Sequence, residues 1–244
     1  MKLSVVIPAY NEEESLPQTL RLLHETLKKH GIEHEICVTN DSSKDGTLRV
    51  LDELTLEIPT LVYFTNPGPN GFGYAVRYGL ERFTGDCAAV FMADMSDDPE
   101  DLVKYYRKMQ ETDVDCVFGS RWDDGGRVVD YPPVKKIINR VANLIIRATM
   151  RIKYNDTTNA FKLYKRETIE GLKPFLAPHF NLTIELPLKA MVRGYTYAVV
   201  PNSWTNRKYG ESKLKIKEMG SRYFFILMYC VIEKYFAQGD YRKK

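Results

Sequence analysis

The chain has 244 residues, of which 44% are hydrophobic and 27% are charged, and its formal net charge at pH 7 is +3. These values are ordinary for a soluble protein that buries a core, and they allow one large domain or two small ones. The net charge is too small to indicate a nucleic-acid partner. The longest apolar run, residues 223–232, is about half as long as the ~20 residues of a membrane-spanning helix.

The start of the chain and its cysteines indicate a compartment. A predicted strand opens at residue 3, so we expect no signal peptide. The four cysteines have no CxxC spacing, and three of them lie in apolar, strand-like runs. We therefore expect reduced core cysteines and a cytoplasmic protein.

Predicted strands and helices alternate through the first half of the chain. Strand-like apolar runs occupy residues 3–7, 35–39, 61–64, 88–92 and 115–118, and segments with helical periodicity lie between them. This βαβαβ order predicts an α/β fold with a mostly parallel, doubly wound sheet and helices on both faces.

The second half is less regular. The pattern predicts, in chain order, a mobile loop, a helix with a broad apolar face, a short strand, a helix interrupted by Pro187 and a last strand, over residues 122–130, 134–151, 160–164, 182–193 and 195–200. We divide the chain into a domain of residues 1–212 and a helical tail of residues 213–244. The tail is basic, then apolar, then basic again, which fits a helix packed on the domain, a helix on an anionic membrane surface, or an oligomer interface.

Three carboxylates follow the predicted strand at residues 88–92. Asp98 precedes Pro99 and Glu100, so it predicts the N-cap of a helix. Asp94 lies four residues before that cap, so capping does not explain it. Ligands of α/β folds bind at the carboxyl ends of the strands, which makes Asp94 the first functional candidate.

Loops at residues 8–12, 40–45 and 94–98 follow separate parallel strands and should converge at one edge of the sheet. They offer the ring of Tyr10 and the carboxylates of Asp41 and Asp94. An aromatic ring with carboxylates suits a nucleoside. A carboxylate can also hold Mg²⁺ or Mn²⁺, which would neutralise a leaving diphosphate. The turn at Gly71 and Gly73 would let Arg77 reach the nucleotide.

Several ordered motifs carry a resemblance to a known family. The segments VVIPAYNEE at 5–13, NDSSKDGT at 40–47, and MAD at 92–94 followed by Pro99-Glu100 resemble family 2 glycosyltransferases of the GT-A fold. The segments GSR at 119–121, DTTNAFK at 156–162, ELPLKA at 185–190 and RKYGESK at 207–213 are similar to the dolichol-phosphate mannose synthase branch.

The resemblance implies roles for individual residues. Pro8, Tyr10, Glu12 and Asp41 are expected at the nucleotide. Asp94 and Arg207 are expected at the catalytic centre, with Asp94 as the metal ligand. The acceptor phosphate is expected to contact Arg121, Lys135, Asn139, Arg140 and Lys213. The family's metal motif is Asp-Ala-Asp, and Met92 replaces its first Asp. A thioether is a poor ligand for Mg²⁺, so we expect weakened binding of Mg²⁺ or Mn²⁺.

The expected function is inverting transfer of a hexose from a nucleotide sugar to polyprenyl phosphate. Mannose from GDP-mannose is the first choice, and a UDP-sugar is possible. An acceptor phosphate, with its second pKa near ~6, is already ionised and needs positive charge rather than a base. Two alternatives stay open: transfer to a saccharide hydroxyl with Glu185 as base, and a non-catalytic nucleotide-sugar-binding protein. A lipid acceptor implies a peripheral protein at the cytoplasmic face of a membrane.

Overall fold

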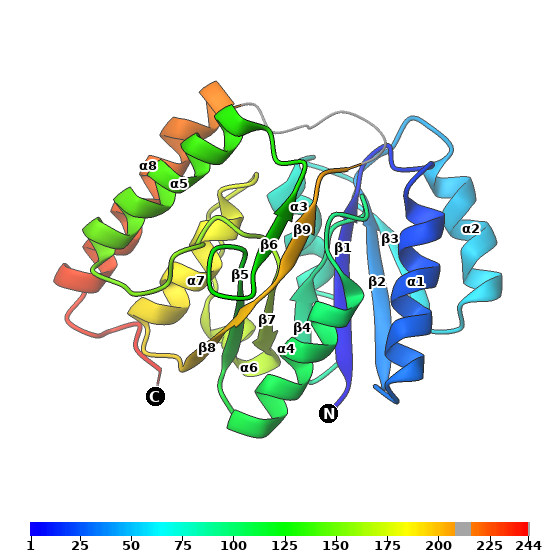
Figure 1. Cartoon of the computed structure of the whole chain (residues 1–244), viewed down its shortest axis with the longest axis horizontal. Helices are drawn as coiled ribbons and strands as arrows, with labels where there is room; N and C mark the ends of the chain where they lie inside the picture. The colour runs from blue at the N-terminus through cyan, green and yellow to red at the C-terminus, as the bar shows by residue number, and fades with distance from the viewer. Residues whose placement is uncertain (208–215, 244) are drawn as a thin grey trace.

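A computed structural model of the chain describes residues 1–207 and 216–243, with residues 216–219 described by their backbone only. In this part of the chain, seven strands form one sheet in the order β3-β2-β1-β4-β7-β5-β8 (Figure 1). Only β7 runs antiparallel to its neighbours in that sheet. The predicted mostly parallel sheet is therefore confirmed. The strands are β1 (Leu3–Ala9), β2 (His34–Asn40), β3 (Leu61–Thr65), β4 (Cys87–Val90), β5 (Cys116–Ser120), β7 (Lys162–Lys165) and β8 (Tyr197–Pro201), beside a separate parallel pair, β6 (Arg127–Val129) and β9 (Ser203–Thr205).

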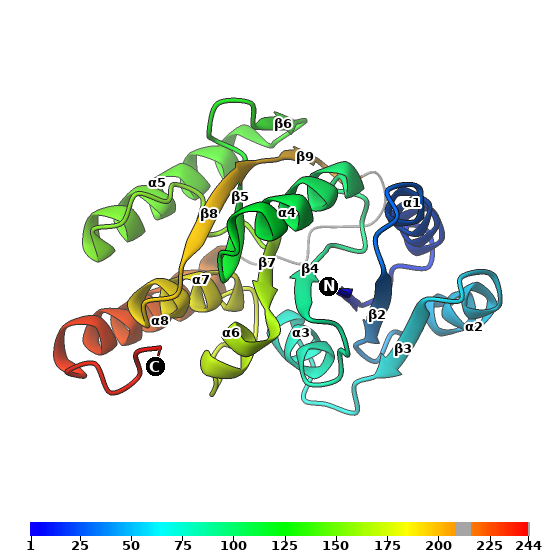
Figure 2. The same cartoon turned by 90° about the horizontal axis from the view of Figure 1, so that it is seen from below.

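Helices cover both faces of the sheet, as predicted (Figure 2). They are α1 (Leu16–Lys29), α2 (Thr47–Glu57), α3 (Phe72–Leu80), α4 (Pro99–Thr112), α5 (Pro133–Met150), α6 (Arg166–Gly171), α7 (Leu182–Val192) and α8 (Ile216–Phe236). Because successive strand side chains point to opposite faces, β1 feeds two cores. Val5 and Ile7 pack with α1, α2 and α4, whereas Val6 packs in the core that contains residues of α3, α6, α7 and α8.

Helix α5 turns most of its apolar surface outward. It buries only Asn143, Ile146 and Met150. Its exposed apolar residues are Val134, Ile137, Ile138, Val141, Leu144 and Ile145. The broad apolar face predicted from the sequence is present, but most of it is not covered by the described residues.

Helix α8 packs on α7 and covers the second core, on the face of the sheet that also carries α3 and α6. Ile226, Leu227 and Cys230 are buried in the second core. Arg193, just after α7, forms a two-pronged ion pair with Glu233 of α8, with Nε–Oε1 at 2.7 Å and Nη2–Oε2 at 3.0 Å. The outer side of α8 exposes a second apolar set, Phe224, Phe225, Met228, Ile232, Tyr235 and Phe236.

Pro187 does not interrupt its helix, contrary to the prediction. Helix α7 runs continuously through Pro187. A proline has no N–H to give to the carbonyl four residues earlier, here that of Thr183. The buried ammonium of Lys162 donates a hydrogen bond to this carbonyl oxygen at 3.3 Å. A side chain from β7 therefore satisfies the group that Pro187 leaves unpaired.

Two further findings concern cysteines and membrane spans. All four cysteines are buried and free, which confirms the predicted core cysteines. Burial raises the pKa of the Cys87 thiol to about 12. Among the helices that the structure describes, none combines the length and apolar character needed to cross a bilayer.

Candidate active site

The first two predicted loops lie against each other at the carboxyl ends of the parallel strands, the upper edge in Figure 1. The backbone N–H of Asn11 donates to Ser43 Oγ at 3.0 Å, and Asn11 Oδ1 accepts from the N–H of Lys44 at 2.8 Å. The loops after β1 and β2 are thus tied together by side chains.

Each of the three loops contains one non-glycine residue with left-handed backbone. These are Asn11, Ser42 and Met95, with φ of 54°, 59° and 61°. Such residues are uncommon outside glycine and cost conformational energy, and they cluster at functional sites. All three lie in the loops that follow β1, β2 and β4, at the edge where these parallel strands end.

Asp94 and Arg207 form the centre of the site. Arg207 Nη2 lies 2.6 Å from Asp94 Oδ2, and Nη1 lies 3.8 Å from Glu12 Oε1. Asp94 is buried, and its Oδ1 accepts from the N–H of Ser96 at 3.1 Å. The guanidinium therefore links the loop after β1 with the loop after β4.

Asp97 is a second buried carboxylate beside Asp94. Its Oδ2 accepts from the N–H of Met92 at 3.0 Å. Burial, reinforced by the negative charge of Asp94, raises the pKa of Asp97 to about 7. Asp98 accepts from the N–H of Glu100 at 2.9 Å, which confirms its predicted role as the N-cap of α4.

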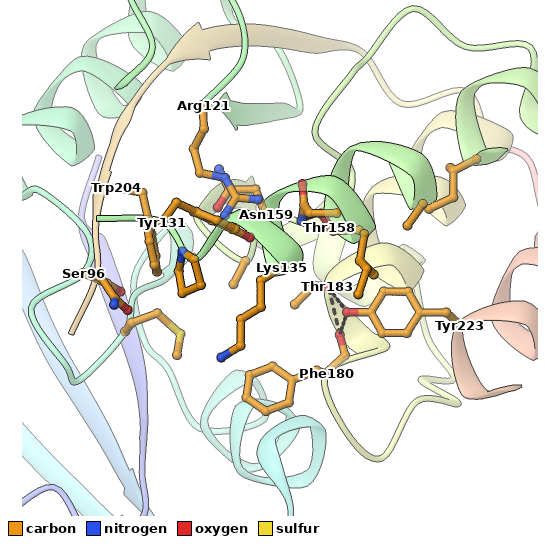
Figure 3. Close-up of a pocket in the computed structure, with 18 of the residues that line it drawn as sticks. Ser96, Arg121, Tyr131, Lys135, Thr158, Asn159, Phe180, Thr183, Trp204 and Tyr223 are labelled. Carbon is orange, nitrogen blue, oxygen red and sulfur yellow. Dashed lines mark hydrogen bonds between the residues drawn. The ribbon is translucent and has the colours of Figure 1, made fainter. Parts of the chain in front are cut away.

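A cavity of about 530 Å³ opens from this centre (Figure 3). That volume lies within the range of roughly 300–1,000 Å³ typical of small-molecule sites. Its charged and polar lining includes Asp94, Asp97, Arg121, Lys135, Asn139 and Arg207. Its apolar lining comes mainly from α5 and α8 and includes Ile138, Ala142, Ile145, Ile146, Tyr223, Phe224 and Leu227. The cavity thus suits a ligand with a charged head and an apolar tail.

Lys135 presents the ammonium that faces this cavity. Figure 3 shows its side chain extending from α5 into the space toward Phe180. Within residues 1–207 and 220–243, no carboxylate lies within ion-pair distance of its Nζ. Asn139, one turn further along α5, donates from Nδ2 to Thr158 Oγ1 at 2.8 Å. Lys135 therefore has positive charge to offer an anionic ligand.

Arg121 lines the cavity but is paired with a protein carboxylate. Its Nε and Nη2 donate to Asp156 Oδ2 and Oδ1 at 2.9 and 2.8 Å, and its backbone N–H donates to Oδ2 at 2.9 Å. The Asp156 charge outweighs burial and raises the pKa of Arg121 above its ordinary value. Arg121 and Asp156 therefore form a fixed, buried ion pair in the cavity wall.

Other predicted residues lie away from the cavity. Arg140 extends over the Trp122 ring, with 5.0 Å from guanidinium carbon to ring centroid, and Arg77 lies over Tyr74 at 5.4 Å. Neither lines the cavity. Lys213 lies outside the described residues.

None of the predicted nucleotide residues Pro8, Tyr10, Glu12 and Asp41 lines the cavity. Pro8 is half-buried, and Tyr10 is exposed. Asp41 is buried and organises the loop before α3, because its Oδ1 accepts from Asn66 Nδ2 at 2.7 Å and its Oδ2 from the N–H of Gly71 at 2.7 Å.

The sequence reasoning missed the aromatic part of the lining. Tyr131 and Trp204 lie with ring centroids 4.8 Å apart, and Phe180 stands opposite Lys135 (Figure 3). They come from three separate loops or short strands, and no spacing in the sequence connects them. Only the tertiary fold brings them together.

Glu185, the base of the alternative function, does not line the cavity. Its fully buried carboxylate accepts from the N–H groups of Leu176 and Ala177 at 2.7 Å each and pairs with Lys189 at 2.5 Å. Through these contacts Glu185 fixes the position of the loop before α7, at Leu176 and Ala177.

The carboxylates at the centre fit a divalent cation only in part. Within the described residues no group of three or more His, Cys, Asp or Glu side chains is placed to hold a metal. Asp94 and Asp97 offer hard oxygen ligands, whereas Met92 offers a thioether. Mg²⁺ is commonly held by one or two carboxylates together with substrate phosphates. The donor set therefore suits a cation that arrives with a diphosphate.

Comparison with solved structures gives the same fold. Glucosyl-3-phosphoglycerate synthase from Mycobacterium tuberculosis in complex with UDP matches with a TM-score of 0.69 at 17% identity, over 94% of this chain and 80% of that chain. The complex of the same protein with Mn²⁺, UDP and glucosyl-3-phosphoglycerate matches with a TM-score of 0.68 at 17% identity, over 96% and 79%. These matches confirm the predicted GT-A fold.

Comparison of sequences gives the family. A dolichol-phosphate mannosyltransferase from Pyrococcus furiosus is 32% identical over 221 residues, which are 89% of this chain and 60% of that protein. An undecaprenyl-phosphate mannosyltransferase from Micrococcus luteus is 29% identical over 220 residues, 88% of each chain. The family model described as glycosyl transferase family 2 matches residues 4–172. The chain therefore belongs to glycosyl transferase family 2, as its motifs predicted.

Proposed function

We propose that this protein transfers a hexose, with inversion, from a nucleotide sugar to a polyprenyl phosphate. The observation that carries the proposal is the cavity, which joins the Asp94–Arg207 centre to an apolar space between α5 and α8. A polyprenyl phosphate has this combination of anionic head and apolar chain. The names of the two mannosyltransferase relatives support the same acceptor class.

Lys135, Arg121 and Arg207 would provide the positive charge around the acceptor phosphate and the leaving diphosphate. Arginine can contact phosphate with two parallel N–H groups, and lysine acts as a point charge. An ionised phosphate can attack the anomeric carbon without losing a proton, so no general base is required. Transfer to a hydroxyl would need one, and Glu185 is bound to backbone N–H groups and Lys189 instead.

The donor would bind along the edge formed by Pro8, Tyr10, Glu12 and Asp41. Mannose carried by GDP is the first choice, because the relatives of similar sequence are mannosyltransferases by name. A UDP-sugar is the alternative, since the solved structures of similar fold hold UDP. Asp94, with Asp97, would hold Mg²⁺ or Mn²⁺. The bound cation would supply charge neutralisation for the diphosphate.

Residues 1–212 would form the catalytic unit, and residues 213–244 a tail that helps to place it at a membrane. The exposed apolar rows of α5 and α8 stand beside the cavity, and basic residues of α5 flank them at Lys136, Arg140 and Arg147. Basic residues near an anionic lipid surface each contribute about 1 kcal/mol of binding. This arrangement supports a peripheral enzyme at the cytoplasmic face of a membrane.

The test is a transfer assay with labelled GDP-mannose, GDP-glucose, UDP-glucose and UDP-N-acetylglucosamine, with polyprenyl phosphate as acceptor. Each donor is assayed with Mn²⁺ and with a chelator. We expect a lipid-linked sugar from GDP-mannose that diminishes strongly with the chelator. If no donor yields a lipid-linked sugar under either condition, the proposed function is wrong.

A further inference from the structure

We infer that the acceptor's isoprenoid chain leaves the site sideways, between α5 and α8, and that Ala142 sets the width of this exit. The inference rests on the proposed function, because it concerns the tail of the proposed acceptor. It adds a residue that selects the acceptor by the shape of its chain.

One face of α5 changes from polar to apolar along its length. The lining residues of α5 include Lys135, Asn139, Ala142 and Ile146. Their spacings of three or four residues place them on one face of the helix. The ammonium and the amide lie toward the charged centre, and the isoleucine lies toward the far end. A phosphate bound at Lys135 would therefore send its chain past Ala142.

The apolar lining continues from the interior to the outer surface. Ile146 and Leu227 are 3% and 6% exposed, whereas Ile145 and Phe224 are 53% and 63% exposed. All four residues line the same cavity. The cavity therefore opens between α5 and α8 directly onto the exposed apolar rows of these helices. A long chain can remain in contact with apolar surface from the site to the outside.

Among the α5 residues that line the cavity, Ala142 has the smallest side chain. Its neighbours in the α5 lining, Ile138, Ile145 and Ile146, all carry four-carbon side chains. A larger side chain at position 142 would project between the charged centre and the apolar exit. It would obstruct a chain that must pass this point, and it would leave the space around Lys135 unchanged.

The test compares Ala142→Val and Ala142→Phe with Val141→Phe. Val141 is adjacent on α5, half exposed and absent from the cavity lining, so it is a matched control. Acceptors are a long polyprenyl phosphate and a one-isoprene phosphate. We expect Ala142→Phe to raise the KM for the long acceptor at least about tenfold, Ala142→Val less, and Val141→Phe little. In all three variants the KM for the short acceptor should stay near the wild-type value. The rise in melting temperature on adding the nucleotide-sugar donor should also stay near that of wild type.

A photo-crosslinking experiment locates the bound isoprenoid chain without depending on turnover. Phe224→Cys carrying a benzophenone should crosslink to the chain of bound polyprenyl phosphate, whereas Leu56→Cys on α2, 89% exposed, should not. The native cysteines are buried and should not compete for the label. A wild-type KM for the long acceptor in a folded Ala142→Phe protein, or equal losses in Ala142→Phe and Val141→Phe, would overturn the inference. If the wild-type protein transfers to neither phosphate, the proposed function fails, and the inference fails with it.

Discussion

At the scale of single residues, Asp94 and Asp98 lie in the same short loop after β4 but make different contacts. Asp94 is buried, pairs with Arg207 and lines the cavity, whereas Asp98 caps α4. We predict that Asp94→Asn lowers turnover at least about 100-fold, because in the proposed function its charge would act at the leaving diphosphate. Asp98→Ala should keep most activity and lose about 1 kcal/mol of unfolding free energy. Steady-state kinetics and urea unfolding of both variants check this division. Equal losses of activity at equal stability would contradict it.

Lys135 and Arg140 test the acceptor assignment, because the sequence predicted both and the structure separates them. The Lys135 side chain extends into the cavity, and Arg140 lies over Trp122. A hydrogen bond to a charged group contributes about 1.5–3 kcal/mol, so Lys135→Met should raise the acceptor KM roughly 10- to 100-fold. Arg140→Met should change it less than threefold, since a distant exposed charge contributes little. A larger effect from Arg140→Met would move the phosphate site to the other side of α5.

Away from the cavity, Glu35 provides a test of how a buried carboxylate contributes to the stability of the fold. Its carboxylate accepts from Ser4 Oγ at 2.6 Å and Lys2 Nζ at 2.9 Å. These contacts and those of Thr84 outweigh burial and lower the pKa of Glu35 from 4.5 to about 2. A depressed carboxyl pKa stabilises the fold above pH 4.5, and this stabilisation is lost as the pH falls toward 2. Glu35→Gln should therefore cost about 2–3 kcal/mol at pH 7 and progressively less below pH 4.5. Urea unfolding at several pH values measures this. If the loss of unfolding free energy did not change with pH, the packing of Glu35 rather than its charge would be what stabilises the fold.

At the scale of elements, α5 is the helix whose orientation matters most for the proposed membrane contact. Ile137 and Leu144 are 65% and 62% exposed on its outer side. We predict that Ile137→Glu with Leu144→Glu lowers binding to vesicles containing anionic lipid about tenfold or more, because two charges replace apolar contacts. Cosedimentation measures the binding. Leu48→Glu with Leu56→Glu, on exposed positions of α2, is the control and should bind as wild type. Equal binding by both double variants would place the membrane contact elsewhere.

The sequence predicted those elements whose signals are local. The alternation of strands and helices, the cap at Asp98 and the loops after β1, β2 and β4 all follow from short patterns. Three features depended on distant contacts. Helix α7 tolerates Pro187 because Lys162 on β7 hydrogen-bonds the carbonyl that the proline leaves unpaired. Strand β7 is antiparallel because it pairs between β4 and β5, which lie far from it in the sequence. The outward turn of α5 cannot be read from periodicity, which shows that a face is apolar but not what covers it.

At the scale of the whole molecule, two cores on opposite faces of one sheet hold the site at the sheet's edge. Four of the residues that the family motifs singled out, Asp94, Arg121, Lys135 and Arg207, line the same cavity, and their functional roles stay predictions. The apolar half was not predicted, because α5 and α8 meet only through the fold and Phe180, Tyr131 and Trp204 share no sequence motif. The cavity between these helices is the observation that supports the proposed lipid acceptor.

The proposed acceptor is a phosphate on an isoprenoid chain. The most direct measurement compares polyprenyl phosphate with the corresponding polyprenyl alcohol, using the same labelled donor and the wild-type protein, with Asp94→Asn as the inactive control. We predict a lipid-linked sugar from the phosphate only, and none from Asp94→Asn. Equal or faster transfer to the alcohol would contradict this assignment, because a hydroxyl acceptor needs a general base and the proposed reaction of an ionised phosphate uses none.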